Sequence, residues 1–202
     1  MTTKQIILDK SLDLFAEKGY YATSVRDIAK VVGIKDSSLY FHFTNKQAIL
    51  DSITEEFIKQ SNEMMKMMSN AVNELQSMSD QMFLSVTEQY ISTYFLNDFI
   101  RKYIIVMNHE QSNNETIREI YRNWFIDQPL KFQEQLFQKL SDISYLKKGN
   151  ISQMVIAYYS PIFLFFNKCI SYNTSKEDDA EFISNTLQTT KHFLDTYKEK
   201  TK

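Results

Sequence analysis

Glycine and proline are scarce in this chain, and their scarcity constrains the fold more than any other feature of the sequence. The 202 residues include three glycines and two prolines, against roughly 14 and about 10 expected from average composition. Sheets need tight turns, and tight turns depend on these two residue types. The sequence therefore predicts an all-α protein built from long helices. Gly19, Gly33 and Gly149 also lie too far apart to form a Gly-rich phosphate loop.

Composition and charge indicate a globular chain with a slightly basic beginning. Hydrophobic residues make up 43% and charged residues 24%, which is ordinary for a folded domain and excludes disorder. Residues 1–50 carry seven basic and five acidic side chains, whereas the rest carries 16 basic and 20 acidic ones. The sign of this asymmetry suits an N-terminal part close to phosphates and a C-terminal part away from them.

Several classes of site and location are not expected. Cys169 is the single cysteine, so neither a disulfide framework nor a cysteine-based metal site can form within one chain. The N-terminus has no apolar signal-like segment, and no apolar run approaches ~18 residues. We expect a cytoplasmic protein without membrane contact, and we expect neither a metal nor a cofactor.

The first 50 residues have the spacing of three short helices followed by a longer one. The first helix should end at Gly19, the second should begin at Ser24 and end at Gly33, and the third should begin near Lys35 with Asp36 as its cap. Thr44 begins a Thr-x-x-Gln capping box for the fourth helix. The turn between the second and third helices is three or four residues long. This layout is that of a helix-turn-helix.

Longer helices are expected in the remainder of the chain. Asp80 and Asn114 are predicted caps, Tyr103 opens a further helical pattern, and Pro129 marks a kink or a helix start. Two long helices are predicted at the end, 151–172 and 176–199. The sequence thus predicts two domains, 1–47 with the helix-turn-helix and 48–202 with a larger helical body.

The segment from Thr23 to Leu50 resembles the DNA-binding domain of TetR/AcrR-family transcriptional regulators. The resemblance rests on ten residues at fixed spacing: Thr23, Ile28, Ala29, Gly33, Leu39, Tyr40, His42, Phe43, Lys46 and Leu50. It implies a helical C-terminal domain that binds a ligand and forms a dimer. Lys35 replaces the family's usual serine and Ser37 its frequent glycine, so the operator sequence cannot be carried over.

The resemblance and the helical pattern together indicate which residues contact DNA. Leu39 and Phe43 form the inward face of the third helix. The outward residues of the third helix should contact DNA phosphates. One of the two residues that begin the second helix should also contact a phosphate. The start of the third helix should reach base edges in the major groove. The predicted phosphate contacts are Tyr40, His42, Lys46 and either Thr23 or Ser24. The predicted base contacts are Lys35, Ser37 and Ser38.

Aromatic residues are frequent in the C-terminal part, and they suggest where an effector binds. Aromatic side chains at helical spacing are usually core residues, and that interpretation stays open for each of them. In the family, however, ligands occupy a cavity inside this domain, so some of these rings should line it. The candidates are Tyr90, Tyr94, Tyr103, Tyr121, Trp124 and Phe125. We expect a sizeable effector that is at least partly hydrophobic or aromatic.

These observations predict a ligand-responsive transcriptional regulator, most simply a repressor. It would bind a palindromic double-stranded DNA operator as a homodimer formed by helices 151–172 and 176–199, with Leu187 and Phe193 on the outer face. One alternative is an all-helical enzyme that uses His109, Glu110 and neighbouring tyrosines. Another is a helical interaction protein that has lost DNA binding. No catalytic arrangement of nucleophile and base is visible in the sequence.

Overall fold

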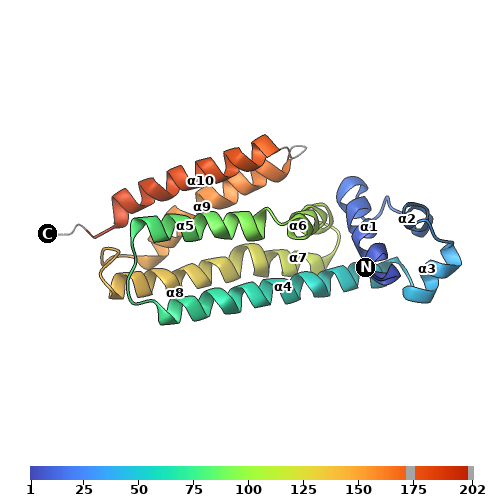
Figure 1. The fold of residues 1–202 in the computed structure, drawn as a ribbon, viewed down its shortest axis with the longest axis horizontal. Helices are drawn as coiled ribbons and strands as arrows, with labels where there is room; N and C mark the ends of the chain where they lie inside the picture. Colours follow the sequence, from blue (N-terminus) through green and yellow to red (C-terminus); the bar gives the residue numbers. More distant parts are fainter. Residues whose placement is uncertain (172–175, 200–202) are drawn as a thin grey trace. The chain divides into compact units, whose positions relative to one another are not determined.

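Helices account for nearly all of the regular structure in the computed structural model, which describes residues 1–171 and 176–199. Their order along the chain is α1 (Thr3–Lys18), α2 (Val25–Val32), α3 (Asp36–His42), α4 (Lys46–Glu74), α5 (Asp80–Tyr90), η1 (Ile91–Phe95), α6 (Asp98–Glu110), α7 (Glu115–Arg122), η2 (Asn123–Asp127), α8 (Gln128–Asp142), α9 (Ile151–Ser171) and α10 (Lys176–Tyr197) (Figure 1). The two η segments are π-helical turns. Within the described ranges, the extended pairing is an isolated bridge between Leu146 and Lys198. The predicted all-α class is confirmed.

The chain packs as two compact units that are not contiguous in sequence. The first unit comprises Met1–Glu63 and Asp98–Arg122, and the second comprises Met64–Asn97 and Asn123–Lys202. Helix α4 supplies residues to both units, because it continues from Lys46 to Glu74. The predicted boundary after residue 47 separates a DNA-binding part from a ligand-binding part, and it stays a prediction.

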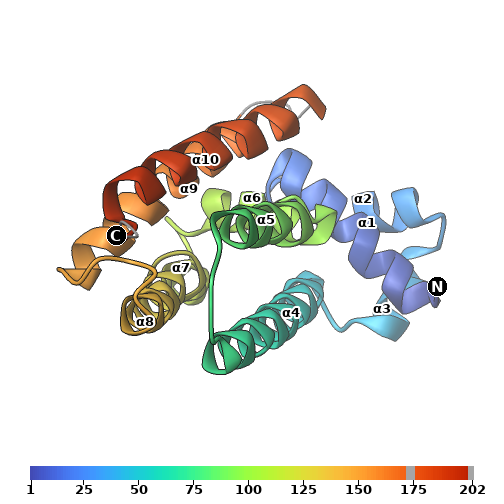
Figure 2. The same cartoon turned by 60° about the vertical axis from the view of Figure 1, so that its left-hand side comes forward.

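The caps of the first two helices confirm the sequence prediction. Gly19 follows α1 with a φ of 86°, and Gly33 follows α2 in the left-handed region with a φ of 78°. Ser24 accepts the Asp27 backbone N–H at 3.1 Å, while the Asp27 carboxylate accepts the Ser24 backbone N–H at 2.8 Å. This reciprocal pair satisfies two amides that a helix N-terminus leaves unpaired. Figure 2 shows the short connections by which α1, α2 and α3 follow one another.

Two predicted caps near α3 and α4 are wrong. Lys35 is the N-cap residue of α3 and makes no side-chain capping bond, whereas Asp36 lies inside the first turn and pairs with Arg26 at 3.6 Å. At α4, Asn45 Oδ1 accepts the Ala48 backbone N–H at 2.9 Å, so Asn45 caps this helix in place of Thr44. Asparagine is a better capping residue than threonine, and it stands one position nearer the first turn.

The later helices follow the predicted pattern with shifted starts. Ser79 caps α5 by accepting the Met82 backbone N–H at 3.2 Å, in place of the predicted Asp80. Helix α6 begins at Asp98, before the predicted Tyr103. The Asn114 cap of α7 is confirmed, because its Oδ1 accepts the Ile117 backbone N–H at 3.1 Å.

Pro129 lies in the first turn of α8, one of the two positions that the sequence allows. Helix α9 begins at Ile151 and α10 at Lys176. The predicted end of the first of these helices at Tyr172 lies outside the described residues, as does Ser175 before the second.

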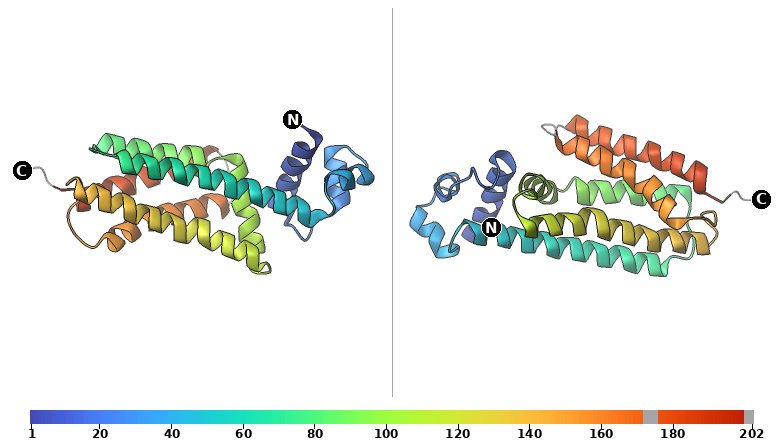
Figure 3. Two further views of the ribbon diagram at one scale, coloured as in Figure 1. Left: turned by 90° about the horizontal axis from the view of Figure 1, so that it is seen from below. Right: turned by 180° about the vertical axis from the view of Figure 1, so that it is seen from behind.

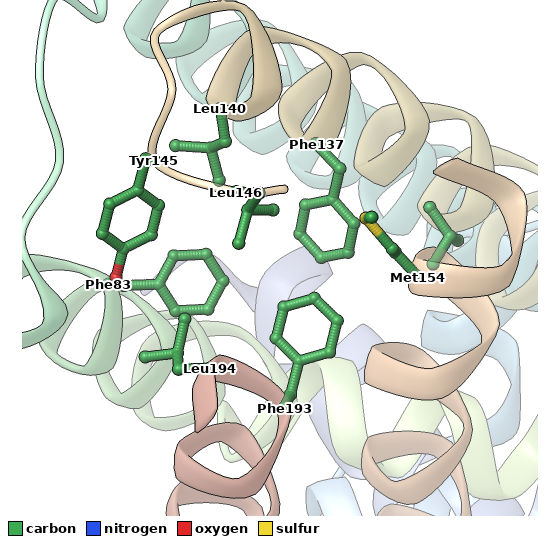
Figure 4. Close-up of a cluster of buried hydrophobic side chains, with 9 residues drawn as sticks. Phe83, Phe137, Leu140, Tyr145, Leu146, Met154, Phe193 and Leu194 are labelled. Atoms are coloured by element: carbon green, nitrogen blue, oxygen red, sulfur yellow. The ribbon is translucent and has the colours of Figure 1, made fainter. Parts of the chain in front are cut away.

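Aromatic rings form the core of the second unit. Phe137 and Phe193 stack with centroids 5.2 Å apart, and Phe83 lies 6.4 Å from each of them (Figure 4). The cluster around these rings also contains Leu140, Tyr145, Leu146, Met154, Val155 and Leu194. Helices α9 and α10 run side by side along their lengths (Figures 1 and 3). The rings thus join α5, α8 and α10 into one apolar core.

Candidate functional site

Helix α3 separates a buried side from an exposed side within seven residues. Leu39 and the following Phe43 are buried, as predicted. Ser37 and Ser38 are exposed in the first turn, and Tyr40 is 53% exposed. His42 is half-buried at the end of the helix. The first unit therefore presents the N-terminal half of α3 to solvent, the geometry by which a recognition helix reads a major groove.

Phe41 is the most exposed large side chain on this face, and it is not among the DNA contacts predicted from the sequence. Its ring is 87% exposed and meets the His42 ring edge-on, with centroids 5.4 Å apart. The available signal was the helical spacing, because a residue two positions after Leu39 and two before Phe43 must point away from both. An exposed apolar ring beside polar side chains can contact a thymine methyl group or a sugar.

Exposed basic side chains lie on α2 and at the start of α3. Lys30, Lys35 and Arg26 are exposed, and the Arg26 guanidinium lies 3.6 Å from the Asp36 carboxylate. This pair partly neutralises Asp36, whose negative charge would otherwise be unfavourable beside a phosphate. At such exposure, the pair adds little to stability.

Lys46 is held by the protein backbone. Its ammonium donates to the Tyr20 carbonyl at 2.6 Å and to the Thr23 carbonyl at 2.7 Å, and it lies 4.2 Å from the centroid of the Tyr20 ring. Burial lowers the pKa of the Lys46 ammonium from its ordinary value, while the Glu110 carboxylate acts in the opposite direction. Lys46 thus fixes the turn between α1 and α2 to the start of α4.

Thr23 and Ser24 have different environments. The Thr23 side chain is buried, and its hydroxyl donates to the Gly19 carbonyl at 2.9 Å. Ser24 is exposed at the N-terminus of α2. Of the two residues considered for one phosphate contact, Ser24 is therefore the one that a phosphate can reach.

His109 and Glu110 do not share one environment. The Glu110 side chain is buried, and its carboxylate accepts the Tyr20 backbone N–H at 3.1 Å, whereas His109 is exposed. Glu110 therefore ties α6 to the same turn that Lys46 holds. Within residues 1–171 and 176–199, no group of three or more His, Cys, Asp or Glu side chains could hold a metal ion.

The second unit contains a cavity of about 310 Å³ between helices, referred to below as the ligand cavity. Its wall is formed by the end of α4, the following turn, α5, α8 and α9, and it is dominated by aliphatic, aromatic and methionine side chains. The lining residues are Met65, Met68, Ala71, Val72, Leu75, Met78, Met82, Phe83, Val86, Thr87, Tyr90, Pro129, Phe132, Gln133, Leu136, Tyr158 and Ile162. Its size and apolar lining are typical of small-molecule sites.

Of the six predicted ligand-binding aromatics, Tyr90 lines the ligand cavity. Tyr94 stacks on Tyr90 with centroids 5.6 Å apart and is buried, as are Trp124 and Phe125. Tyr103 and Tyr121 belong to the first unit. The Tyr103 ring packs 4.7 Å from the Phe57 ring, and its hydroxyl lies 2.7 Å from that of Thr54. Tyr94, Tyr103, Trp124 and Phe125 are buried, and Tyr121 is partly buried, so their role in ligand binding stays a prediction.

Two methionines of α4 line the ligand cavity, a role that their sequence did not predict. Met65 and Met68 are three positions apart on one face of the helix, and Val72 and Leu75 continue that face. The signal was present in the helical spacing of apolar residues after position 64. It could not show which helices lie opposite.

Helix α9 has apolar side chains that are exposed within one copy of the chain. Ile156 is 54% and Leu164 is 64% exposed within one copy of the chain. Phe193, expected on the outer face of α10, is buried in the aromatic core, so that expectation is wrong. In the described part of the chain, no helix is both long and apolar enough to span a bilayer.

Comparison with known proteins places the exposed α3 and its neighbours in context. Residues 7–53 match the family model described as "Bacterial regulatory proteins, tetR family". IcaR of Staphylococcus aureus strain Newman, an HTH-type negative transcriptional regulator of the biofilm operon icaADBC, is 27% identical over 143 residues, which cover 68% of this chain and 77% of IcaR. KstR2 of Rhodococcus jostii strain RHA1, an HTH-type transcriptional repressor, is 48% identical over 52 residues, or 26% of each chain.

Solved structures share the fold over nearly the whole length. A TetR-family transcriptional regulator from Mesorhizobium loti superposes with a TM-score of 0.71 at 16% identity, covering 97% of this chain and 96% of the other. The complex of triclosan with SmeT, a repressor of a multidrug efflux pump from Stenotrophomonas maltophilia, gives a TM-score of 0.73 at 16% identity, covering 98% and 93%. At these identities, the likeness establishes the fold.

Proposed function

Because this chain is a DNA-binding transcriptional regulator of the TetR family, we propose that it is a repressor whose operator is released by a small molecule. The observation that carries the proposal is the exposed side of α3, where Tyr40 and Phe41 face solvent while Leu39 and Phe43 are buried. Folding alone gives no reason to expose two neighbouring aromatic rings, whereas a surface that docks against DNA does.

We assign the proposed DNA contacts from the exposure and hydrogen bonds of the candidate residues. Base edges are assigned to Lys35, Ser37 and Ser38 in the first turn of α3, with Phe41 added as an apolar contact. Phosphates are assigned to Ser24, Tyr40 and His42. Lys46 and Thr23 are assigned a positioning role, because their polar atoms are engaged with backbone carbonyls inside the first unit. A regulator that binds an operator must share a compartment with the DNA, so we propose that the protein is cytoplasmic.

We place the dimer contact on the exposed stripe of α9 that contains Ile156 and Leu164. These two side chains are eight positions apart on one face of the helix, where Ala157 and Ser160 are exposed between them. Two copies related by a two-fold axis would pair this stripe with itself. A palindromic operator follows, because each copy would present one α3 to one half-site.

The ligand cavity is the proposed effector site. Helix α4 begins beside the turn held by Lys46 and continues into the wall of the cavity at Met65 and Met68. A ligand that favours one position of the end of α4 would therefore also favour one position of its start. Occupancy would shift the population toward a state with lower operator affinity. The SmeT–triclosan complex supports a ligand site in a protein of this fold.

In vitro selection from a random DNA library tests the function. We expect the full chain to enrich a palindromic sequence. The logarithm of its binding constant for that sequence should fall linearly with the logarithm of the salt concentration. Lys35→Ala should weaken binding to that site by about 1–3 kcal/mol. Lys131→Ala, which removes an equally exposed charge from α8, should leave it unchanged. Failure to enrich any sequence would contradict the proposal.

A further inference from the structure

Gln133 is a nearly buried polar residue of the cavity wall, and its amide oxygen makes no hydrogen bond among the described residues. The side chain is 6% exposed, and its Oε1 has no hydrogen-bond partner among the described residues. Leaving a buried acceptor unpaired is unfavourable, and native proteins usually retain such a group for a reason. Gln133 Oε1 is enclosed by the protein, and because Gln133 lines the cavity, a turn of its amide group would present this oxygen to a donor in the cavity.

A second polar group in the wall also offers an acceptor. The Thr87 hydroxyl donates to the Phe83 carbonyl at 2.9 Å, and it lies 2.9 Å from the Tyr158 hydroxyl. Threonine has one hydroxyl hydrogen, so Tyr158 must donate to Thr87 in the second contact. The Tyr158 oxygen is left with lone pairs. Gln133 Oε1 and Tyr158 therefore both favour a ligand that donates a hydrogen bond.

Charge is absent from the lining of the cavity as far as the described residues go. No Lys, Arg, His, Asp or Glu side chain contributes to the wall. Burial raises the pKa of Tyr158 to about 12 and that of Tyr90 well above its ordinary value, so both phenols are neutral at physiological pH. A charged ligand would lose its hydration there without gaining an opposite charge.

The α4 part of the wall is suited to adapt to an apolar ligand. Between Met64 and Glu74 no side chain is fully buried, although Met65, Met68 and Val72 face the cavity. Methionine fills irregular spaces well because its side chain is unbranched and flexible. An apolar ligand would remove these side chains from water, which favours binding in proportion to the area buried.

We propose that the ligand cavity selects uncharged, lipophilic molecules that carry an O–H or N–H donor, and that Gln133 is the residue that determines this specificity. The inference rests on the proposed function, because it names the chemical class of the effector for the same cavity. It differs from a general preference for hydrophobic compounds in one respect. It requires a donor on the ligand, paired with Gln133 Oε1.

Three probes of similar shape test the inference by calorimetry on the full chain without DNA. They are 4-hexylphenol, which has a donor, 4-hexylanisole, in which a methyl group replaces the hydrogen, and 4-hexylbenzoate, which is ionised at about pH 8. We expect the phenol to bind about tenfold more tightly than the anisole, the effect of one buried hydrogen bond. The benzoate should bind at least tenfold more weakly than the phenol.

Gln133→Met removes the amide oxygen while keeping the length of the side chain. In this variant, the phenol should lose its advantage and bind about as tightly as the anisole. Gln135→Met makes the same change at an exposed position of α8, and it should retain the tenfold preference. If Gln133→Met does not fold, the three probes on the unaltered protein still decide the question.

Equal affinity for phenol and anisole would overturn the inference, as would tightest binding of the benzoate or no binding of any probe. A preference that survives in Gln133→Met would also overturn it, because another group would then hold the donor. These measurements contain no DNA, so their failure leaves the DNA selection result intact. Conversely, a protein that selects no DNA sequence can still show the predicted ligand preference.

Discussion

At the scale of single residues, side chains of the same type have opposite roles within the first unit. Phe43 is a core residue and Phe41 is exposed, although they are two positions apart. Lys35 is exposed at the start of α3, whereas the Lys46 ammonium is engaged by two carbonyls. Helical spacing predicts the first contrast. The second depends on where the turn after α1 places its carbonyls, which the sequence does not encode locally.

The two phenylalanines provide a matched test of the DNA-binding surface. Phe41→Ala should leave the free energy of unfolding within about 0.5 kcal/mol of the unaltered protein, since the ring is exposed, and it should weaken operator binding. Phe43→Ala should cost about 3–5 kcal/mol of stability, because it removes a buried ring. Denaturant unfolding and fluorescence anisotropy with the selected DNA measure the two effects. Unchanged operator affinity in Phe41→Ala would remove Phe41 from the interface.

Lys46→Met tests the positioning role of this lysine. Two carbonyls lose their donor, so we expect a loss of about 1–3 kcal/mol in stability. The slope of log K for DNA against log salt should stay the same, because no phosphate contact is removed. Lys66→Met, which changes an exposed lysine of the same helix, should leave both quantities unchanged. A slope that falls by about one unit with stability intact would instead place the Lys46 ammonium on a phosphate.

At the scale of the helices, the sequence predicts which helices form and in what order better than it predicts the residue at which each helix begins. Gly19 and Gly33 end α1 and α2 because their backbone angles are unfavourable for other residues. Starts are harder to predict, because adjacent residues compete for one capping position. Thr44 and Asn45 illustrate this competition, and the backbone geometry at the turn decides in favour of Asn45.

Alanine substitutions at these two adjacent positions test the assignment of the α4 cap. Asn45→Ala should destabilise the protein by about 1 kcal/mol, because the Ala48 N–H loses its acceptor. Thr44→Ala should change stability by no more than about 0.5 kcal/mol, since Thr44 is exposed and makes no capping bond. Thermal unfolding under identical conditions compares the two variants. The reverse order of effects would restore the capping box that the sequence suggested.

At the scale of the whole molecule, what the sequence cannot predict is which helices meet. Met65 and Phe132 both line the ligand cavity, although 67 positions separate them. Each lies on an apolar helix face, and an apolar face looks the same whether it meets core or cavity. For the same reason the core tyrosines could not be distinguished from Tyr90, which lines the cavity, and Phe193 could not be placed in the core.

The proposed dimer is tested by a charge on the exposed stripe of α9. Leu164→Glu should give a folded monomer in sedimentation velocity, because the side chain is exposed within one copy but would be buried between two. Met67→Glu introduces the same charge at a comparably exposed position of α4, and it should leave the dimer intact. A Leu164→Glu protein that still sediments as a dimer would place the interface elsewhere.

The central claim is that the ligand cavity controls DNA binding, and titration of the protein–operator complex with 4-hexylphenol tests it most directly. Anisotropy of labelled operator DNA follows the release. We predict that the phenol releases the operator at concentrations that match its affinity for the free protein, and that Gln133→Met needs higher concentrations for the same release. A complex that stays intact while calorimetry shows the cavity to be occupied would contradict the account.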